Sequence, residues 1–428
     1  MSVPTYNQYK TTSKCVFTPE IPEHWKVRKL KFMGAVQNGR DYKHVESEEG
    51  YDVIGSGGAF VKASDYLYSG ESVLFGRKGT IDEPLYINDK FWTVDTMFYT
   101  IVQEETVAKY LYYCSKTIPF KYLATQTALP SITQFDLENF YLTYPNKDEQ
   151  QKIANFLDYK THQIDQLIEK KKALIEKLDE QRIAVITQAV TKGIDDNVKM
   201  KSSGVEWLGD IPLTWKPRKL RFIFGFGRGL GITKAELKDD GVPCVNYGEI
   251  HSRYGFEVIP ERDALKYVDP VYLETDIHSL LESGDFVFAD TSEDLDGSGN
   301  FTYLNSNHKT FAGYHTVVAK PKIQVNSRFL AFLFDAQIFR SQIRKSVSGV
   351  KVFSITQGIL KDCIAWLPLI DEQQRIVEHL DRILNKSDRM KQLNLAAIDK
   401  LEEYRVSLIT AAVTGKINVQ KVDIPKGE

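Results

Sequence analysis

The 428-residue chain has few of the features that mark secreted, membrane or strongly charged proteins. Its four cysteines, Cys15, Cys114, Cys244 and Cys363, lie far apart and form no CxxC pair. That spacing argues against a zinc site or a disulfide framework and suits a reducing cytoplasm. No stretch approaches the roughly 18 apolar residues of a membrane-spanning helix, and the N-terminal segment contains no apolar signal-peptide core. The net charge of −2 provides no basic excess, so a surface facing nucleic acid would need segregated charge.

Catalytic motifs are equally scarce. The sequence has no GxxxxGKS/T loop, and its eight histidines include no HExxH motif and no His/Cys pair at metal-ligand spacing. Asp269–Tyr272 resembles the Asp/Asn-Pro-Pro-Tyr/Phe motif of amino-methyltransferases, but it lacks one proline, and chance explains it better. Cys114 and Cys363 stand in apolar surroundings, where a buried side chain is expected rather than a nucleophile. The residues therefore offer binding chemistry without a catalytic constellation.

Short motifs recur and divide the chain into two halves. Residues 21–33 (IPEHWKVRKLKFM) and 211–223 (IPLTWKPRKLRFI) are identical at eight of thirteen positions. Three further pairs recur 223 residues apart: Ser131–Gln134 with Ser354–Gln357, Asp148–Gln151 with Asp371–Gln374, and Ile186–Thr191 with Ile409–Thr414. We call these four pairs the frame, and the divergent residues 34–130 and 224–353 the inserts. A duplicated frame around two different inserts is expected of a protein that reads two different targets.

Both inserts consist of short apolar runs separated by Gly, Asp and Asn, which predicts strand-rich domains. The expected strands of the first half are Tyr51–Ile54, Ser72–Phe75, Leu85–Ile87 and Phe98–Val102, with a helix near Val107–Ser115. Those of the second half are Val242–Val245, Asp285–Ala289, Phe301–Leu304 and His315–Ala319, with a helix near Ser327–Ser341. The alternating glycines from Gly225 to Gly231 do not fit GxGxxG, and they favour a flexible or DNA-approaching loop over a cofactor site.

A long helix is expected at the end of each half. Apolar residues step by three and four over residues 153–185 and again over 376–408, as in an amphipathic or coiled-coil helix. Asp148–Gln151 and Asp371–Gln374 fit capping boxes at the two helix starts. About 40 residues would give roughly 60 Å of helix. Packing of these helices on a globular core is the alternative.

Gly193 and Gly415 follow the last apolar residues and fit left-handed C-caps. The first helix leads out of the first half and the second begins where the second insert ends, so packing the two together makes them antiparallel. The predicted fold class is α+β: two strand-rich domains separated by two long antiparallel coiled-coil helices, with a pseudo-two-fold internal repeat. The expected boundaries are 1–145 for the first domain, 146–194 for the first helix, 195–368 for a linker and the second domain, and 369–428 for the second helix and tail.

The clearest binding segment is Gly76–Thr80, which follows an expected strand and contains Arg77, Lys78 and Thr80. A glycine-bounded loop of this kind can bring backbone N–H groups and two cations to phosphates or a base edge. A solvated β-turn explains the same residues equally well. The corresponding segment of the second half, Asp290–Asn300, is acidic and longer, as expected if the halves read different sequences.

The repeated Ser-Ile-Thr-Gln segment begins an expected helix in each half and could donate to a phosphate there. Because both halves share it, the segment should position DNA rather than specify its sequence. The candidate DNA-binding residues are Arg77, Lys78, Thr80, Ser131, Thr133, Arg228, Thr291, Ser292, Asn300, Lys351, Ser354 and Thr356. No catalytic, cofactor-binding or metal-ligating residue is assigned.

Taken together, these motifs resemble those of the specificity subunits of type I restriction-modification systems. The resemblance rests on IPxxWKxRKLxF at Ile21–Phe32 and Ile211–Phe222, on Ser-Ile-Thr-Gln, on the segments Pro145–Gln151 and Pro368–Gln374, and on the long helices. It covers nearly the whole chain. Each motif alone is weak, but the full set occurring twice in this order is highly specific.

The resemblance implies two target recognition domains, each reading one half of a split, asymmetric site on double-stranded DNA. It also implies a helical spacer and docking of two adenine-methyltransferase subunits, to which two restriction/translocase subunits add. S-adenosylmethionine, ATP and magnesium then belong to those partners, and this chain is a non-catalytic, cytoplasmic subunit. Two other interpretations stay open: a self-contained methyltransferase or nuclease, and a coiled-coil scaffold that does not contact DNA.

Overall fold

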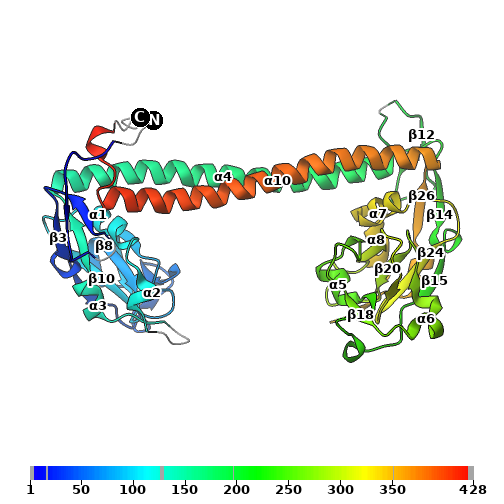
Figure 1. Ribbon diagram of the computed structural model, residues 1–428, viewed down its shortest axis with the longest axis horizontal. Coiled ribbons are helices and arrows are strands. Elements are labelled where there is room, and N and C mark those ends of the chain that lie inside the picture. The colour runs from blue at the N-terminus through cyan, green and yellow to red at the C-terminus, as the bar shows by residue number, and fades with distance from the viewer. Residues whose placement is uncertain (1–3, 16–17, 126–129, 196, 350, 423–428) are drawn as a thin grey trace. The chain divides into compact units, whose positions relative to one another are not determined.

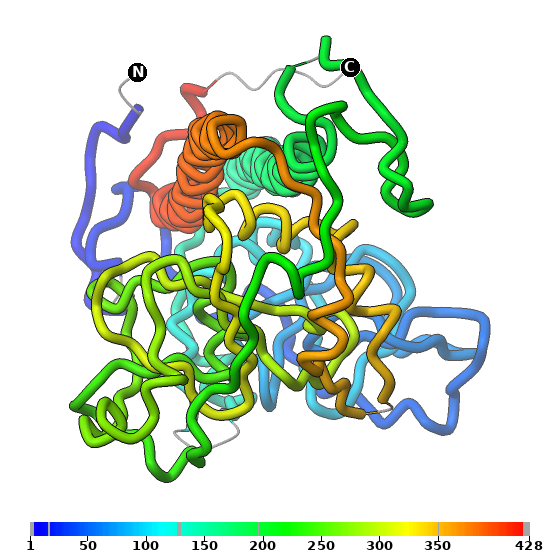
Figure 2. Tube along the Cα trace, turned by 90° about the vertical axis from the view of Figure 1, so that its right-hand side faces the viewer, coloured from blue at the N-terminus to red at the C-terminus, as the bar shows by residue number. Residues whose placement is uncertain are grey.

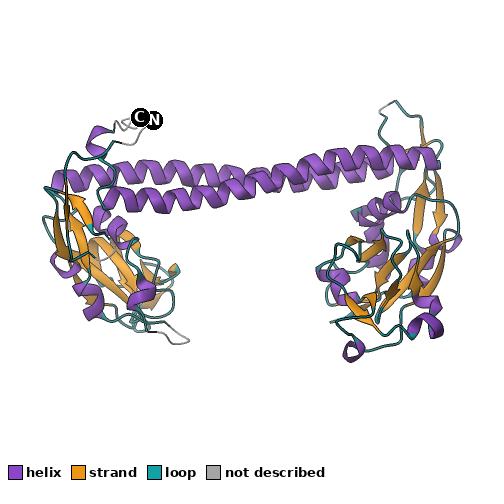
Figure 3. Ribbon diagram, in the orientation of Figure 1, coloured by secondary structure: helices purple, strands orange, loops and turns teal. Residues whose placement is uncertain are grey.

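The structure is a computed structural model that describes residues 4–15, 18–125, 130–195, 197–349 and 351–422 (Figure 1). It contains two compact units, one formed by Met1–Ala173 with Asn394–Glu428 and the other by Leu174–Leu393. Each unit combines β-sheets with short helices and with part of two long helices (Figure 3), which confirms the predicted α+β class. No helix among the described residues is long and apolar enough to cross a membrane.

A seven-stranded sheet forms the body of the first unit, with strand order β4-β10-β8-β9-β6-β7-β5. Neighbouring strands are antiparallel except β6 and β9, which are parallel. The strands are β4 (Gly34–Asn38), β5 (Glu46–Ser47), β6 (Tyr51–Gly55), β7 (Gly58–Ala63), β8 (Tyr68–Gly76), β9 (Leu85–Thr93) and β10 (Met97–Val102). Two ribbons pair β1 (Tyr9–Thr11) with β2 (Glu20–Pro22), and β3 (Lys26–Lys29) with β11 (Tyr141–Tyr144). The short helices are η1 (Leu30–Phe32), α1 (Ala108–Ser115), α2 (Phe120–Leu123), α3 (Gln134–Asn139) and η5 (Val419–Lys421).

Side chains from the sheet and from α1 form the core of this unit. Phe75, Phe98 and Leu111 are buried to 1% exposure or less, and α1 contacts β8 and β9. The buried hydroxyls are satisfied between strands, since Ser72 Oγ donates to Thr100 O (2.8 Å) and the Thr100 hydroxyl bonds to the backbone of β8. Each expected strand of the first half lies within β6, β8, β9 or β10, and α1 begins one residue after the expected helix start.

The second unit contains a five-stranded sheet of order β15-β24-β20-β22-β17 and a four-stranded sheet of order β18-β16-β23-β19. The strands are β12 (Met200–Ser202), β13 (Asp210–Pro212), β14 (Lys216–Lys219), β15 (Phe224–Arg228), β16 (Val242–Val245), β17 (Phe256–Val258), β18 (Lys266–Val268), β19 (Leu280–Leu281), β20 (Phe286–Ala289), β21 (Thr291–Ser292), β22 (Phe301–Leu304), β23 (Thr310–Ala312), β24 (Thr316–Pro321), β25 (Phe353–Ser354) and β26 (Ile364–Leu367). The short helices are η2 (Leu220–Phe222), η3 (Lys234–Glu236), α5 (Tyr247–Ser252), α6 (Tyr272–Thr275), η4 (Ile277–Ser279), α7 (Ser327–Asp335), α8 (Gln337–Ser346) and α9 (Gln357–Asp362). The four strands expected from the sequence are β16, β20, β22 and β24, each within one or two residues of its predicted ends.

The helix expected near Ser327–Ser341 is instead two helices, α7 and α8, separated at Ala336. Ala336 is extended, with φ −63° and ψ 133°. This break brings the ring of Phe339 to a centroid distance of 4.6 Å from Phe334, in a core cluster that includes Phe286. Burial of the two rings outweighs helix continuity here, and neither glycine nor proline marks the break in the sequence.

The long helices α4 (Lys147–Lys192) and α10 (Ile370–Val413) lie side by side in each unit (Figures 1 and 2). Their polar contacts, written with the α4 residue first, are Asp165–Arg405 (2.6 Å) and Lys171–Asn394 (3.1 Å) in the first unit, and Asp179–Lys391 (2.7 Å) and Arg182–Asp388 (3.3 Å) in the second. Residue numbers rise along one helix as they fall along the other. The pairing is therefore antiparallel in both units, as predicted.

The starts of these helices differ from the predicted capping boxes. Asn146 caps α4, because its Oδ1 accepts a hydrogen bond from Glu149 N (2.9 Å) and Asp148 lies inside the first turn. In α10 the N–H groups of Glu372 and Gln373 both donate to the backbone carbonyl of Leu369 (3.0 Å each), and Asp371 again lies inside the helix. The predicted C-caps are confirmed: Gly193 and Gly415 have φ of 81° and 76°.

Candidate functional site

The repeated Asp-Glu-Gln-Gln segment attaches each insert to the frame. Gln150 Oε1 accepts from Val107 N (2.9 Å), just before α1, and its Nε2 donates to Pro145 O (3.0 Å). Gln373 makes the matching pair of bonds in the second unit: its Oε1 accepts from Asn326 N (2.8 Å), just before α7, and its Nε2 donates to Pro368 O (3.0 Å). Both glutamine side chains are buried, so each amide satisfies a free N–H group at the start of an insert helix.

A carboxylate about two turns further along each long helix makes a second attachment. In the first unit Asp158 bonds to Lys109 Nζ and accepts from the Tyr113 hydroxyl (2.8 Å), both on α1. In the second unit Asp381, which is 223 residues later, accepts two bonds from Arg328 Nε of α7 (2.8 and 2.9 Å). The two inserts are thus joined to their helices at equivalent points by the same chemistry.

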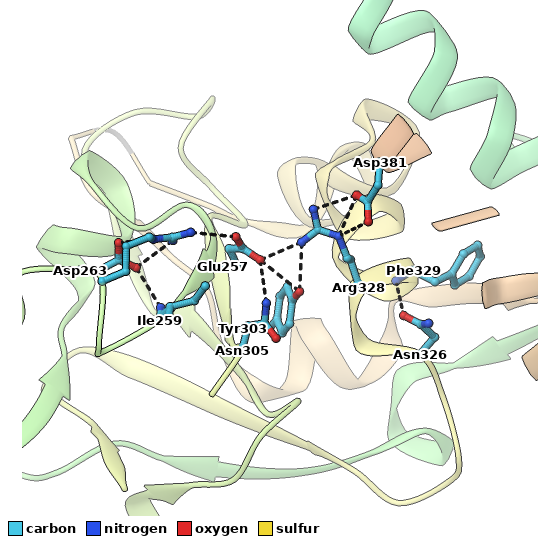
Figure 4. Close-up of polar contacts among 10 residues, drawn as sticks. Glu257, Ile259, Asp263, Tyr303, Asn305, Asn326, Arg328, Phe329 and Asp381 are labelled. Atoms are coloured by element: carbon cyan, nitrogen blue, oxygen red, sulfur yellow. Dashed lines mark hydrogen bonds and ion pairs between the residues drawn. The ribbon is translucent and has the colours of Figure 1, made fainter. Parts of the chain in front are cut away.

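The second attachment continues into the sheet. Figure 4 shows Arg328 between Asp381 and Glu257, whose Oε2 accepts from Arg328 Nη1 (2.8 Å) and from the Tyr303 hydroxyl (3.3 Å). Burial lowers the pKa of the Arg328 guanidinium, but hydrogen bonds to Asp381 and Tyr303 raise it overall, so Arg328 stays charged. The arginine therefore joins α7, β17 and α10 through charge-assisted hydrogen bonds.

The predicted binding loop of the first unit lies against the segment that leads into α3. Arg77 O accepts from Ile132 N (3.1 Å), Gly79 N donates to Pro130 O (3.0 Å), and Lys78 forms an antiparallel bridge with Ser131. Arg77, Lys78 and Thr80 are exposed, and the Arg77 guanidinium lies 5.8 Å from the centroid of the Phe98 ring. The structure therefore brings Arg77, Lys78 and Ser131 together on one exposed strip.

The corresponding strip in the second unit has the same backbone pattern. Asp290 O accepts from Ile355 N (2.7 Å), and Thr291 of β21 pairs with Ser354 of β25. Asp290 and Thr291 thus occupy the places that Arg77 and Lys78 occupy in the first unit, which confirms the predicted equivalence. The first strip therefore presents two basic side chains where the second presents a carboxylate and a hydroxyl. Lys351 is exposed shortly before β25.

Thr133 and Thr356 act as helix caps at these strips. The Thr133 hydroxyl oxygen accepts from Asp136 N (3.1 Å) at the start of α3, and that of Thr356 accepts from Ile359 N (3.2 Å) at the start of α9. The expected helix starts are therefore confirmed. The Thr133 hydroxyl also donates to the Asp136 carboxylate, which leaves it no proton for a phosphate.

Two other candidates are bonded within the second insert, where Ser292 is buried and Asn300 is half-buried. Ser292 is 4% exposed, and its hydroxyl donates to Asp294 O (2.7 Å). The Asn300 amide lies 2.8 Å from His251 Nδ1 and accepts from Arg340 Nη1 (2.6 Å). These contacts fold the acidic loop onto α5 and α8, and they separate Ser292 and Asn300 from the exposed residues of the strip.

The first part of the glycine-rich segment, up to Arg228, is strand β15 rather than the predicted loop, and Gly229 to Gly231 follow the strand. β15 pairs with β24, with Gly225 opposite Lys320 and Gly227 opposite Val318, and Arg228 is exposed at its end. The next glycine, Gly229, approaches the backbone so closely that a Cβ atom there would lie 1.9 Å from Gly313 O. Close backbone approach therefore accounts for a glycine that looked flexible in the sequence.

The candidates predicted from the sequence do not include four residues that position the inserts: Gln150, Gln373, Asp158 and Asp381. Their common separation of 223 residues is the signal that could have identified them. As expected, Cys114 and Cys363 are buried, and burial raises the pKa of each thiol to about 12. Among the described residues no group of three or more His, Cys, Asp or Glu side chains could hold a metal ion.

The family model for the type I restriction modification DNA specificity domain matches residues 22–177 and 212–398. The chain is 22% identical over 423 residues to the type I restriction enzyme MjaVIII specificity subunit of Methanocaldococcus jannaschii, covering 94% of this chain and 95% of the relative. It is also 22% identical over 445 residues to the putative MjaX specificity subunit of the same organism, with the same coverage.

Solved structures show a similar fold. The HsdS subunit from Thermoanaerobacter tengcongensis has a TM-score of 0.56 at 13% identity, covering 93% of this chain and 98% of that chain. A chain from work on complex assembly and conformational transition of the type I R-M system has a TM-score of 0.71 at 13% identity, covering 93% and 99%. With two family matches over most of its length, the chain belongs to the family of type I restriction-modification specificity subunits.

Proposed function

We propose that this chain is the non-catalytic DNA-recognition subunit of a type I restriction-modification complex, and that each unit reads one half of a bipartite, asymmetric site. The observation that carries the proposal is the pair of equivalent strips. Both are joined to the frame by the same backbone bond, Ile132 N to Arg77 O and Ile355 N to Asp290 O. The residues that they present differ in charge, as two readers of different half-sites require.

The chemistry of the two strips fits different base edges. Arg77 and Lys78 are donors of the kind that bind guanine O6 and N7 or a phosphate, while Thr291 can donate or accept and Asp290 can only accept when ionised. Good base contacts of this kind each contribute roughly 1–3 kcal/mol of discrimination. A serine occupies the same place in both strips, Ser131 in the first and Ser354 in the second. We assign these serines to contacts with the DNA backbone that position the protein on its site.

The partners follow from the same proposal. Two adenine-methyltransferase subunits would supply S-adenosylmethionine chemistry, and two restriction/translocase subunits would use ATP and magnesium, all in the cytoplasm. The purified chain alone should show neither methylation nor cleavage. Sustained turnover by a clean preparation of the chain would contradict this assignment.

The test is to map methylated adenines in DNA from cells that carry the methyltransferase subunit with this chain. We expect one motif with two constant halves and an unread spacer. Replacing Arg77 and Lys78 by alanine should relax or abolish recognition of one half only, and Thr291→Ala should affect the other. Lys62→Ala is the matched control, because Lys62 is a half-exposed cation of the same sheet that pairs with Asp52. If the Arg77/Lys78 variant changed neither half, the strip would not be the reading surface.

A further inference from the structure

The eight identical positions of the first repeated motif fall into two sets. Four are buried in both units and pack into the core: Ile21/Ile211, Pro22/Pro212, Trp25/Trp215 and Leu30/Leu220. The other four are half-buried or exposed: Lys26/Lys216, Arg28/Arg218, Lys29/Lys219 and Phe32/Phe222. Core packing explains the first set. It does not explain why an aromatic and three cations recur on the surface of both units.

The phenylalanines are the clearest members of the second set. Phe32 is 58% exposed at the end of η1, and Phe222 is 64% exposed at the end of η2. A single exposed apolar side chain is ordinary on a protein surface. The same exposed aromatic on the same turn of both units is different, because the inserts that follow have diverged.

Basic residues lie close to each phenylalanine in the sequence, and their partners differ between the units. Lys29 Nζ and Lys31 Nζ both donate to the neutral Asn139 Oδ1 (2.9 and 3.4 Å). At the matching position of the second unit, Asp362 forms ion pairs with Lys219 (2.8 Å) and Arg221. Within the described part of the chain, Lys29 and Lys31 make no ion pair with a carboxylate.

The surface of the first unit is hollowed beside Phe32. A depression of about 620 Å³ is lined by Lys14, Arg28, Lys29, Lys31, Phe32 and Tyr141, with Val27 and Gln103. Three of these cations lie over aromatic rings: Arg28 is 4.1 Å from the centroid of Tyr144, Lys29 is 5.4 Å from that of Tyr141, and Lys31 is 5.5 Å from that of Phe32. Their positions are held by these rings before any partner binds.

We propose that β3–η1 in the first unit and β14–η2 in the second are two docking surfaces for two copies of one protein partner. Each copy receives Phe32 or Phe222 in an apolar pocket and presents carboxylates to the neighbouring cations. Aromatic side chains and arginine are enriched at protein interfaces, where a few such residues dominate the binding energy. The inference rests on the proposed function, which supplies a partner present in two copies, the methyltransferase subunit.

Nucleic acid fits this surface less well than protein does. Asp362 lies among the cations of the second unit, where it would repel a phosphate, whereas the exposed phenylalanine is unchanged in both units. Phosphate contacts use cations, and a phenylalanine on a turn adds nothing to them. The feature that the two surfaces share most closely is therefore the one that a protein pocket recognises.

The test measures binding of the purified methyltransferase subunit to the full chain by native mass spectrometry and surface plasmon resonance. Phe32→Ala and Phe222→Ala should each weaken one of two sites on the order of 30-fold, and the double variant should weaken both. Phe135→Ala is the matched control, because Phe135 is 72% exposed in the first unit but is replaced by Gly358 at the equivalent position. Phe32→Leu, which keeps an apolar side chain, should recover most of the binding.

Each outcome decides the inference. Unchanged affinity for two copies in a folded double variant would overturn it, and the proposed function would stand. Loss of DNA binding with unchanged methyltransferase binding would assign the surface to DNA instead. If the unaltered chain bound no methyltransferase subunit, the proposed function and the inference would both fail. Circular dichroism checks folding, and little change is expected because both side chains are exposed.

Discussion

The carboxylate that attaches the first insert bonds to a single helix, whereas the one in the second unit begins a network of hydrogen bonds that crosses the sheet. Asp158 bonds to Lys109 and Tyr113 of α1, and from Lys109 a cation–π contact with Tyr86 (5.5 Å) continues to β9. Asp381 binds Arg328, which continues to Glu257 and from there to Tyr303 and other residues of the insert. The two carboxylates lie at equivalent points of the long helices, but the hydrogen-bond network that starts at Asp381 extends further into its insert. Attachment is thus a property of the frame, and what lies beyond the first helix of an insert is free to vary.

Exchange of an insert should have the largest effect, because it replaces the variable part of one unit and leaves the frame in place. Replacing residues 34–128 by the corresponding residues of a relative should change one half of the methylated motif completely and leave the other half unaltered. The donor insert should carry Lys or Arg at the position of Lys109, because Asp158 remains in the recipient. Mapping of methylated adenines measures the result. A change in both halves would show that one insert does not read one half-site.

Substitution of Asp381 and of Asp158 compares how much each attachment stabilises its unit. Asp381→Ala should lower the free energy of unfolding of the second unit by about 2–3 kcal/mol, because a bidentate, charge-assisted contact is lost and Arg328 keeps only part of its network. Asp158→Ala should cost the first unit about 1 kcal/mol. Amide hydrogen exchange, measured at α1 for the first unit and at α7 for the second as denaturant is added, gives the stability of each unit separately.

Asp388→Ala is the control for this pair of variants. Asp388 lies on the same helix as Asp381 and forms an exposed ion pair with Arg182, so its loss should cost roughly 0–1 kcal/mol. Equal destabilisation by Asp158→Ala and Asp381→Ala would mean that the longer network adds nothing to the attachment.

A smaller, pH-dependent effect is expected at Glu149. Its buried carboxylate accepts from the Tyr6 hydroxyl (2.5 Å) and lies 3.0 Å from His24 Nε2. Burial raises the pKa of the Glu149 carboxyl, but hydrogen bonds from Tyr6, Gln420 and His24 lower it below its usual value of 4.5 overall. Since the folded-state pKa is depressed, the charged form stabilises the unit above about pH 4.5, and this stabilisation is lost as the pH falls through the folded-state value.

Unfolding of the unaltered chain and of Glu149→Gln should therefore differ most at neutral pH and converge as the solution is acidified. Glu169→Gln, an exposed change on the same helix, should show no such convergence. A difference that stays constant down to pH 3 would show that the carboxylate charge is not what stabilises this region.

Local patterns in the sequence predicted the strands, both long helices and the equivalence of the two strips. They failed where distant residues decide. Asn146 and Asp148 are both good capping residues two positions apart, and only the point at which the chain enters α4 selects Asn146. Ala336 interrupts a helix because Phe334 and Phe339 meet in the core, which no neighbouring residue indicates.

The candidate site shows the same division. Arg77, Lys78 and Thr80 are where a loop after a strand places them, on an exposed strip. The sequence makes Asn300 equally suitable, but its amide is bonded to His251 and Arg340, each about 40 residues or more away in sequence. Composition and turn signals cannot reveal such contacts.

The buried glutamines have a consequence for how new specificities arise. Gln150 and Gln373 bond to the backbone N–H before an insert helix and to a backbone carbonyl of the chain leading into the long helix. Every residue except proline carries that N–H group. An unrelated insert can therefore be accepted without any matching substitution in the glutamine, so this part of the frame places almost no sequence requirement on a new insert.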